Sequence, residues 1–281
     1  MATVKELETI AKQISRDLLR MIHARQSGHP GGSLGITDLL VTLYFEIMEH
    51  NPKDFKIDGE NQDLFFLSNG HCSAAWYSVL ARSGYFSISE LATFRGLNSR
   101  LQGHPTTAEH LPGIRIASGS LGQGLSVACG AALAKKLNHD DKLVYCLCGD
   151  GEIEEGQIWE AALFAQARKI DNLIAFIDAN GQQIDGTTEQ VLNLVKLKEK
   201  WEAFNWDVIE CNGNNIEELI RAINVAKLKI GLGRPIMIIM KTEMGMGVDF
   251  MMGTHKWHGT PPNDEQLKNA LSQIDETLGD Y

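Results

Sequence analysis

The sequence predicts an α/β fold in which a doubly wound, mainly parallel sheet carries helices on both faces. Short, wholly apolar runs alternate along the chain with longer stretches of helical composition. Strands buried on both faces of a parallel sheet have this continuous apolar character, and helices supply the crossovers between them. A glycine-containing turn, Gly149-Asp150-Gly151, follows one apolar run. Ligands of such sheets bind outside the carboxyl ends of the strands. We expect residues 1–281 to form a single domain.

The elements follow from apolar runs and helical periodicity. The run 143–148 ends at a glycine, the stretch 158–167 has helical composition, and 173–178 is typical of a second buried strand. A right-handed crossover makes these two strands parallel. The expected strands are 64–67, 143–148, 173–178, 206–209 and 236–240. The expected helices are 4–25, 37–49, 72–82, 122–137, 156–168, 215–230 and 264–278. The long, irregular segment from Gly96 to Gly119 is typical of a functional loop.

Composition excludes several classes of function. The chain has 26 Lys and Arg against 36 Asp and Glu, a net charge of −10, so we expect no nucleic-acid partner. No apolar stretch is long enough to span a bilayer, and residues 1–25 lack the apolar core of a signal peptide, so we expect no membrane partner. Five cysteines, an odd number without metal or redox spacing, indicate a reducing, cytoplasmic location.

Polar residues follow two neighbouring strands of the expected sheet. Asp150 follows the first, and Asn180 follows the second. The carboxyl ends of parallel strands meet at one edge of the sheet, so these side chains would offer two hard oxygen ligands to one cation. The glycines beside Asp150 allow the backbone to approach an anion, and the following helix start favours negative charge. This combination suits Mg²⁺ holding a diphosphate.

Several of the nine histidines lie in loops rich in glycine and proline. They are His29, His71, His104, His255 and His258. A backbone fixed by such residues holds a titratable ring in one place, and several converging rings suit a polyhydroxylated substrate that exchanges protons. A zinc site at His255 and His258, which are three residues apart, is the competing explanation. The spacing lacks the further ligands that zinc requires.

The motifs together resemble the transketolase family. Those that match in order from about Ile14 to Pro261 are Ser27-Gly-His-Pro-Gly31, Leu67-Ser-Asn-Gly-His71, Gly103-His-Pro105, Gly119-Ser-Leu-Gly-Gln-Gly124, Gly149-Asp-Gly151, Asn180-Gly181, Ile184-Asp-Gly186 and His258-Gly259. The likeness is to the first, diphosphate-binding domain of a transketolase. The departures are Ala179 where many thiamine enzymes have Asn, Gly32-Ser-Leu for Ala-Pro-Met, and Ser120 for Pro. The last two, with Glu152-Ile-Glu-Glu155, resemble the split form whose halves are separate chains.

The resemblance implies a role for each matching residue. Asp150, Asn180 and the backbone carbonyl of Gln182 would bind Mg²⁺, for which Ca²⁺ or Mn²⁺ can substitute. The sugar would be bound by His29, His104 and His258, with His29 and His258 placed for proton transfer. Glu155 matches an interface carboxylate close to the cofactor. Thiamine diphosphate would be contacted by His71, Gly119, Leu121, Gly151, Glu155, Asn180, Ile184, Met244 and His258.

The same resemblance implies that half of an active site is missing. In the family, the carboxylate that hydrogen-bonds the aminopyrimidine ring and the groups that bind the sugar phosphate lie on the following domain. We therefore expect a separate pyrimidine-domain subunit, a two-plus-two heterotetramer and sugar phosphate substrates, with xylulose 5-phosphate as an example of the donor. The alternatives are a deoxyxylulose-phosphate synthase, a decarboxylating component of a 2-oxo-acid dehydrogenase, and a non-catalytic nucleotide-binding module. The absence of Gly-x-Gly-x-x-Gly and Walker motifs disfavours the last.

Overall fold

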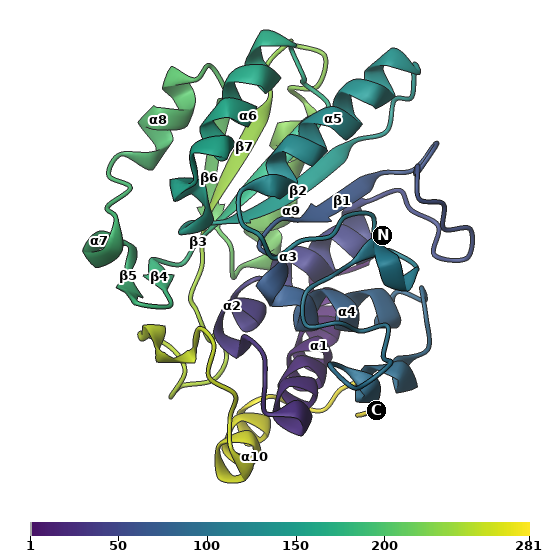
Figure 1. Ribbon diagram of the computed structural model, residues 1–281, viewed down its shortest axis with the longest axis vertical. Helices are drawn as coiled ribbons and strands as arrows, with labels where there is room; N and C mark the ends of the chain where they lie inside the picture. Colours follow the sequence, from purple (N-terminus) through teal and green to yellow (C-terminus); the bar gives the residue numbers. More distant parts are fainter. Residues whose placement is uncertain (1) are drawn as a thin grey trace.

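A computed structural model describes residues 2–281 and confirms the predicted fold class (Figure 1). Five parallel strands form the central sheet in the order β1-β2-β3-β7-β6. Their bounds are β1 (Leu64–Leu67), β2 (Val144–Gly149), β3 (Leu173–Ala179), β6 (Asp207–Asn212) and β7 (Ile236–Lys241). A small antiparallel pair, β4 (Gln182–Gln183) and β5 (Gly186–Thr187), follows β3. The expected strands therefore all exist, within a few residues of their expected bounds.

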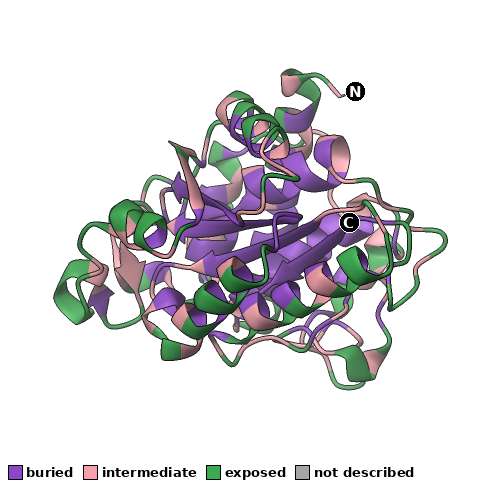
Figure 2. Ribbon diagram, turned by 90° about the horizontal axis from the view of Figure 1, so that it is seen from above, coloured by how far each residue is buried: buried purple, intermediate pink, exposed green. Residues whose placement is uncertain are grey.

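Helices cover both faces of the sheet. The α-helices are α1 (Val4–Arg25), α2 (Pro30–Gly35), α3 (Thr37–Thr42), α4 (Ser73–Arg82), α5 (Gln123–Leu137), α6 (Gly156–Ala167), α7 (Thr188–Val191), α8 (Leu197–Ala203), α9 (Ile216–Lys227) and α10 (Asp264–Gln273). Seen from above, the buried strands run between two layers whose outer surfaces are exposed (Figure 2). Helices α5, α6 and α8 pack on one face, and α1, α3, α4 and α9 pack on the other.

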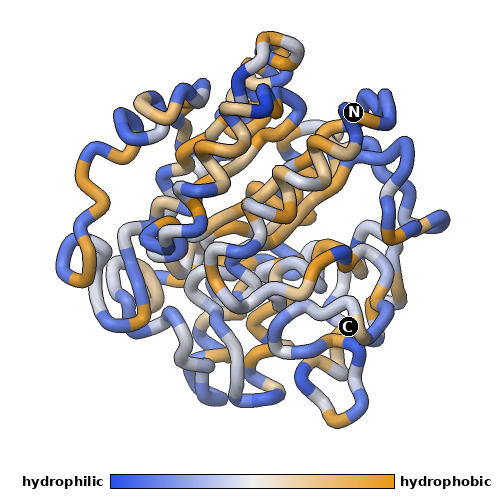
Figure 3. The backbone as a smooth tube through the Cα atoms, turned by 45° about the horizontal axis from the view of Figure 1, so that its top comes forward, coloured by the Kyte–Doolittle hydropathy of each residue, from blue (hydrophilic) through white to orange (hydrophobic). Residues whose placement is uncertain are grey.

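Alternation along each strand divides the interior into two cores. Phe65 and Leu67 of β1 face the core formed with α1, α3, α4 and α9, whereas Leu64 and Phe66 face the core formed with α5 and α6. Successive strand residues point to opposite faces, so a strand buried on both sides must be apolar at every position. The most hydrophobic stretches of the backbone accordingly run through the central strands (Figure 3).

Several elements differ from the expected ones for local reasons. The helix expected over 37–49 is α3 followed by a π-helical turn, Leu43–Ile47, and the helices expected to reach 230 and 278 end at Lys227 and Gln273. Sequence patterns missed the short helices α2, α7 and α8. Helix α2 contains three glycines in six residues, which lowers its intrinsic helix propensity, and its Pro30 occupies the first turn, where a missing N–H costs nothing.

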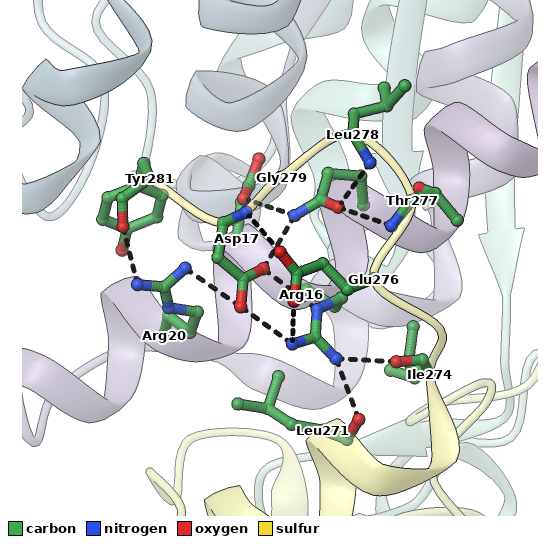
Figure 4. Close-up of polar contacts among 12 residues, drawn as sticks. Arg16, Asp17, Arg20, Leu271, Ile274, Glu276, Thr277, Leu278, Gly279 and Tyr281 are labelled. Atoms are coloured by element: carbon green, nitrogen blue, oxygen red, sulfur yellow. Dashed lines mark hydrogen bonds and ion pairs between the residues drawn. The ribbon is translucent and has the colours of Figure 1, made fainter.

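The segment after α10 packs along α1 through charged groups (Figure 4). The Arg16 guanidinium donates to the carbonyl oxygens of Leu271 at 2.9 Å and Ile274 at 2.7 Å, and to the Asp280 carboxylate at 2.8 and 2.9 Å. Asp17, whose side chain is fully buried, pairs with Arg82 at 2.7 Å. Arg82 also donates to the Gly279 carbonyl oxygen at 2.8 Å, so residues 271–280 are tied to both α1 and α4, on the side of the sheet opposite α5 and α6.

Within residues 2–281, no helix combines the length and the apolar character needed to cross a membrane.

Candidate functional site

The carboxyl edge of the sheet brings the expected polar residues together. Gly149 of β2 pairs in register with Asp178 of β3, so Asp150 and Asn180 leave neighbouring strand ends. A cavity of about 140 Å³ lies there. Its lining comes from the loops after β1, β2 and β3, the turn before α5 and the segment before α10: Asn69, His71, Leu121, Gly149, Asp150, Gly151, Glu152, Asp178, Asn180, Gln182, Gln183, Ile184 and His258.

Asp150 is a buried carboxylate held by backbone N–H groups. Its side chain accepts hydrogen bonds from Gly151 N–H at 2.8 Å and Gly181 N–H at 2.6 Å, and the residue is 4% exposed. Burial, together with the nearby charge of Asp178, raises the pKa of Asp150 to about 7. A divalent cation beside this group would stabilise its charged form and lower this pKa again.

Asp178 orients Asn180, a role that the sequence pattern did not reveal. The Asn180 amide donates from Nδ2 to the Asp178 carboxylate at 2.9 Å, which directs Oδ1 away from it. Asp178 is 2% exposed and also accepts a hydrogen bond from the Thr242 hydroxyl. Burial raises the pKa of Asp178 to about 6. A carboxylate inside the otherwise apolar run 173–178 was the signal that could have revealed it.

Four histidine rings converge beside the cavity. The His29 ring centre lies 5.1 Å from that of His71, 5.8 Å from that of His258 and 6.1 Å from that of His104. Burial lowers the pKa of all four, that of His29 to about 4, so the rings are neutral at pH 7. Among residues 2–281, the buried Nδ1 atoms of His29 and His258 have no hydrogen-bonding partner. Neutral rings with free nitrogens can bind hydroxyl groups and accept their protons.

The glycine at position 119 is required by the close approach of His104. Gly119 has φ +132°, and a Cβ there would lie 2.8 Å from the His104 ring. The His104 ring therefore lies directly against the turn that precedes α5. The loop from Gly96 to Gly119 thus carries His104 to the cluster; its functional role stays a prediction.

The remaining expected site residues occupy different positions. Ile184 lines the cavity and is 63% exposed, whereas Met244 lies outside the cavity lining, is 1% exposed and packs against Gly31. Glu155 lies outside the cavity lining, directly before α6, with its side chain close to Gly122. His255 does not join the histidine cluster; it begins a short 3₁₀ turn, His255–Trp257.

The zinc alternative has no geometric support. No group of three or more His, Cys, Asp or Glu side chains within the described range 2–281 is arranged to hold a metal ion. The expected magnesium ligands are of another kind, because only Asp150 among them is such a side chain. Asn180 contributes an amide oxygen and Gln182 a backbone carbonyl.

Comparison with known protein families identifies the family of the chain. Residues 8–276 match the family model described as "Transketolase, thiamine diphosphate binding domain". The chain belongs to the transketolase family. This assignment confirms the resemblance seen in the sequence and excludes a nucleotide-binding module. As a transketolase-family enzyme subunit, the chain contains the domain that binds thiamine diphosphate.

Curated relatives of similar length are named as transketolase subunits. An apulose-4-phosphate transketolase subunit of Phocaeicola vulgatus is 38% identical over 98% of this chain and 96% of its own length. The 6-deoxy-6-sulfo-D-fructose transketolase subunit of Clostridium sp. is 39% identical over 96% and 97%, respectively. The human transketolase is 33% identical over 96% of this chain but only 42% of its own length.

Solved transketolases share the fold. The structure from Campylobacter jejuni superposes with a TM-score of 0.90 at 36% identity, covering 97% of this chain and 43% of that one. The structure from Leishmania mexicana gives 0.89 at 31%, covering 100% and 42%. The chain therefore spans less than half the length of these transketolases.

The residues at the carboxyl edge fit the cofactor of this family. The buried Asn69 Oδ1 and Gln182 Oε1 atoms lack partners among residues 2–281, and both residues line the cavity with Asp150 and Asn180. Unpaired buried acceptors are costly unless a ligand or water satisfies them. A cation beside Asp150 and a polar ligand in the cavity would supply the partners that these buried oxygen atoms lack.

Proposed function

We propose that the chain is the diphosphate-binding subunit of a split transketolase, with residues 1–281 forming one domain. The enzyme would transfer a two-carbon ketol unit from a ketose phosphate such as xylulose 5-phosphate to an aldose phosphate such as ribose 5-phosphate. The observation that carries the proposal is the convergence of four neutral histidine rings beside a buried Asp–Asn pair. The histidine rings suit a polyhydroxylated substrate, and the Asp150–Asn180 pair suits a cation that holds a diphosphate.

The metal in this proposal is Mg²⁺, with Ca²⁺ or Mn²⁺ able to substitute. Its ligands would be the Asp150 carboxylate, Asn180 Oδ1 and the backbone carbonyl of Gln182. The hydrogen bond from Asn180 Nδ2 to Asp178 supports this ligand set, because it directs Oδ1, which also accepts from Gln182 N–H at 2.9 Å, toward the place of the cation. Mg²⁺ completes its shell with phosphate and water oxygens, so few protein ligands are needed.

The cofactor would lie between the metal and the histidines. We assign its contacts to His71, Gly119, Leu121, Gly151, Asn180, Ile184, Met244 and His258, and place Glu155 at the nearby subunit interface. When bound, thiamine diphosphate would supply a carbon nucleophile and a thiazolium ring able to accept the electron pair of the broken carbon–carbon bond. The protein contributes positioning and groups that take up and return protons.

The histidines would accept and return the protons of the sugar hydroxyl groups. Cleavage between C2 and C3 of the donor turns its C3 hydroxyl into an aldehyde, so that hydroxyl must lose a proton. The acceptor's carbonyl oxygen must gain one when the new bond forms. His29 and His258, each with a free buried Nδ1, are the groups we assign to these transfers, and His104 would hold a donor hydroxyl.

A second polypeptide is required in this proposal. It would carry the pyrimidine-binding domain, and two copies of each chain would form a heterotetramer. Relatives named as subunits support the separate partner. Exposed apolar side chains on neighbouring helices support self-pairing: Val127 of α5 is 41% exposed, and Leu163 and Phe164 of α6 are 57% and 41% exposed.

The proposal is tested by assaying the chain with thiamine diphosphate and Mg²⁺, with and without a candidate partner. The donor panel should include xylulose 5-phosphate, apulose 4-phosphate and 6-deoxy-6-sulfo-D-fructose, because relatives are named for the last two. We expect ketol transfer only in the presence of the partner. Turnover by the purified chain alone would contradict the requirement for a second subunit, and inactivity of the assembly on every donor would contradict the proposed reaction.

A further inference from the structure

The buried carboxylate of Glu152 connects three loops around the cavity. Glu152 is 1% exposed and lies on the short 3₁₀ turn after Gly151. One of its oxygens accepts hydrogen bonds from the Ser68 hydroxyl and from Gly122 N–H at 2.9 Å. The other accepts from Gly149 N–H at 3.0 Å. The carboxylate therefore bonds to the loop after β1, the turn before α5 and the end of β2.

Ser68 extends this connection by one further bond. Its hydroxyl oxygen accepts from Gly124 N–H at 3.0 Å, so Glu152 and Ser68 together hold two N–H groups at the start of α5. The approach is close, because a Cβ at Gly124 would collide with the Ser68 side chain. Glu152 also lines the cavity, but the hydrogen bonds of its side chain go to Ser68, Gly122 and Gly149, while Glu155 occupies the N-cap position of α6.

We propose that Glu152 is a positioning residue that fixes these three loops relative to one another and thereby shapes the pocket for thiamine diphosphate. Each bonded loop carries a residue assigned to the cofactor. Leu121 precedes Gly122, Gly151 precedes Glu152 itself, and His71 lies on the loop that begins at Ser68. The inference rests on the proposed function, because it concerns the same cofactor, but Glu152 itself is assigned no contact with the cofactor.

A carboxylate is suited to this position because it only accepts hydrogen bonds. An ionised carboxylate has two oxygens and room for three donors, whereas a glutamine offers one oxygen and turns an N–H₂ group toward backbone donors. Burying a charge is costly unless it is hydrogen-bonded. The donors to Glu152 come from the loop after β1, the turn before α5 and the end of β2, so this cost is offset only when these segments are in place.

The test combines hydrogen exchange with a cofactor titration on the full chain. The variants are Glu152→Ala and Glu152→Gln. The matched control is Asp63→Asn, which alters another buried carboxylate, 4% exposed, that joins two loops at the opposite edge of the sheet by accepting from Glu49 N–H at 2.9 Å and Leu143 N–H at 2.7 Å.

In Glu152→Ala we expect the amides of Gly122 and Gly149 to exchange about tenfold faster or more, while amides of α1 keep their wild-type rates. The affinity for thiamine diphosphate with Mg²⁺ should fall about 10- to 100-fold, the usual effect of losing a group that supports a ligand-binding residue. Glu152→Gln should lie between Glu152→Ala and the wild type. The control should leave both readouts unchanged.

Two results would overturn the role of Glu152. Unchanged exchange at Gly122 and Gly149 would show that the carboxylate does not hold these loops. Uniformly faster exchange across the chain would show that it only stabilises the fold. The exchange measurement needs no ligand, so it remains decisive even if the wild-type chain fails to bind thiamine diphosphate, a result that would instead contradict the proposed function.

Discussion

Replacing Asp150 by asparagine tests whether the cavity is built to receive a cation. In the metal-free chain, burial and the charge of Asp178 raise the pKa of Asp150 from 3.8 to about 7. The unfolded chain therefore releases the Asp150 proton at a lower pH than the folded chain does. As a result, the free energy of unfolding falls as the pH rises from 3.8 to about 7. With about 1.36 kcal/mol for each pKa unit, the wild type should lose roughly 3 kcal/mol relative to Asp150→Asn between about pH 5 and pH 8.

Urea unfolding of both proteins at the two pH values, with a chelator present, measures this difference. The amide that Asp150→Asn introduces turns an N–H toward Gly151 or Gly181, but that cost is nearly the same at both pH values and cancels. Adding Mg²⁺ with thiamine diphosphate at the higher pH should stabilise the wild type far more than the variant, because only the wild type keeps the charged ligand. Identical pH dependence in the two proteins would refute the reasoning.

Three further predictions concern the histidines and the fold. His104→Ala should lower kcat/KM for the donor by the equivalent of about 1–3 kcal/mol while leaving the affinity for thiamine diphosphate unchanged. Steady-state kinetics and calorimetry on the assembled enzyme measure the two quantities. An unchanged kcat/KM would remove His104 from the substrate site. Burial lowers the pKa of His29 to about 4, so the wild type should lose stability as pH falls. Relative to His29→Asn, its free energy of unfolding in urea should fall by about 2 kcal/mol between pH 7 and pH 5. The same pH dependence of unfolding free energy in both proteins would contradict this. Arg82→Ala leaves Asp17 buried without its partner and should cost about 3–5 kcal/mol of unfolding free energy, whereas Lys12→Ala, which breaks the exposed pair with Asp275, should change little.

Much of the fold could be predicted because the strands are buried on both faces. Every residue of 64–67 and 173–177 must be apolar, which leaves a strong signal in the sequence. The order of the strands could not be predicted. After β3 the chain forms the edge strand β6 and then inserts β7 between β3 and β6, an arrangement that depends on packing between distant segments. Helix α2 escaped detection because it is short and rich in glycine, although its Pro30 marked a possible start.

The site was predicted to the extent that its residues lie at strand ends or beside glycines. Asp150, Asn180 and the clustered histidines were found in this way, and the structure brings them to one edge of the sheet. Asp178 and Glu152 were missed because they act through other protein groups. Their sequence positions, inside a strand and in an acidic turn, do not reveal that Asn180 or Gly122 would be their partners.

The most direct test of the central claim is a crystal structure of the full chain, with its partner if required, grown with thiamine diphosphate and Mn²⁺. We expect an anomalous Mn²⁺ peak coordinated by Asp150 and Asn180, with the diphosphate beside Gly151 and the histidine cluster facing the thiazolium ring. Thiamine diphosphate bound at another place, or Mn²⁺ bound without contact to Asp150, would contradict the claim.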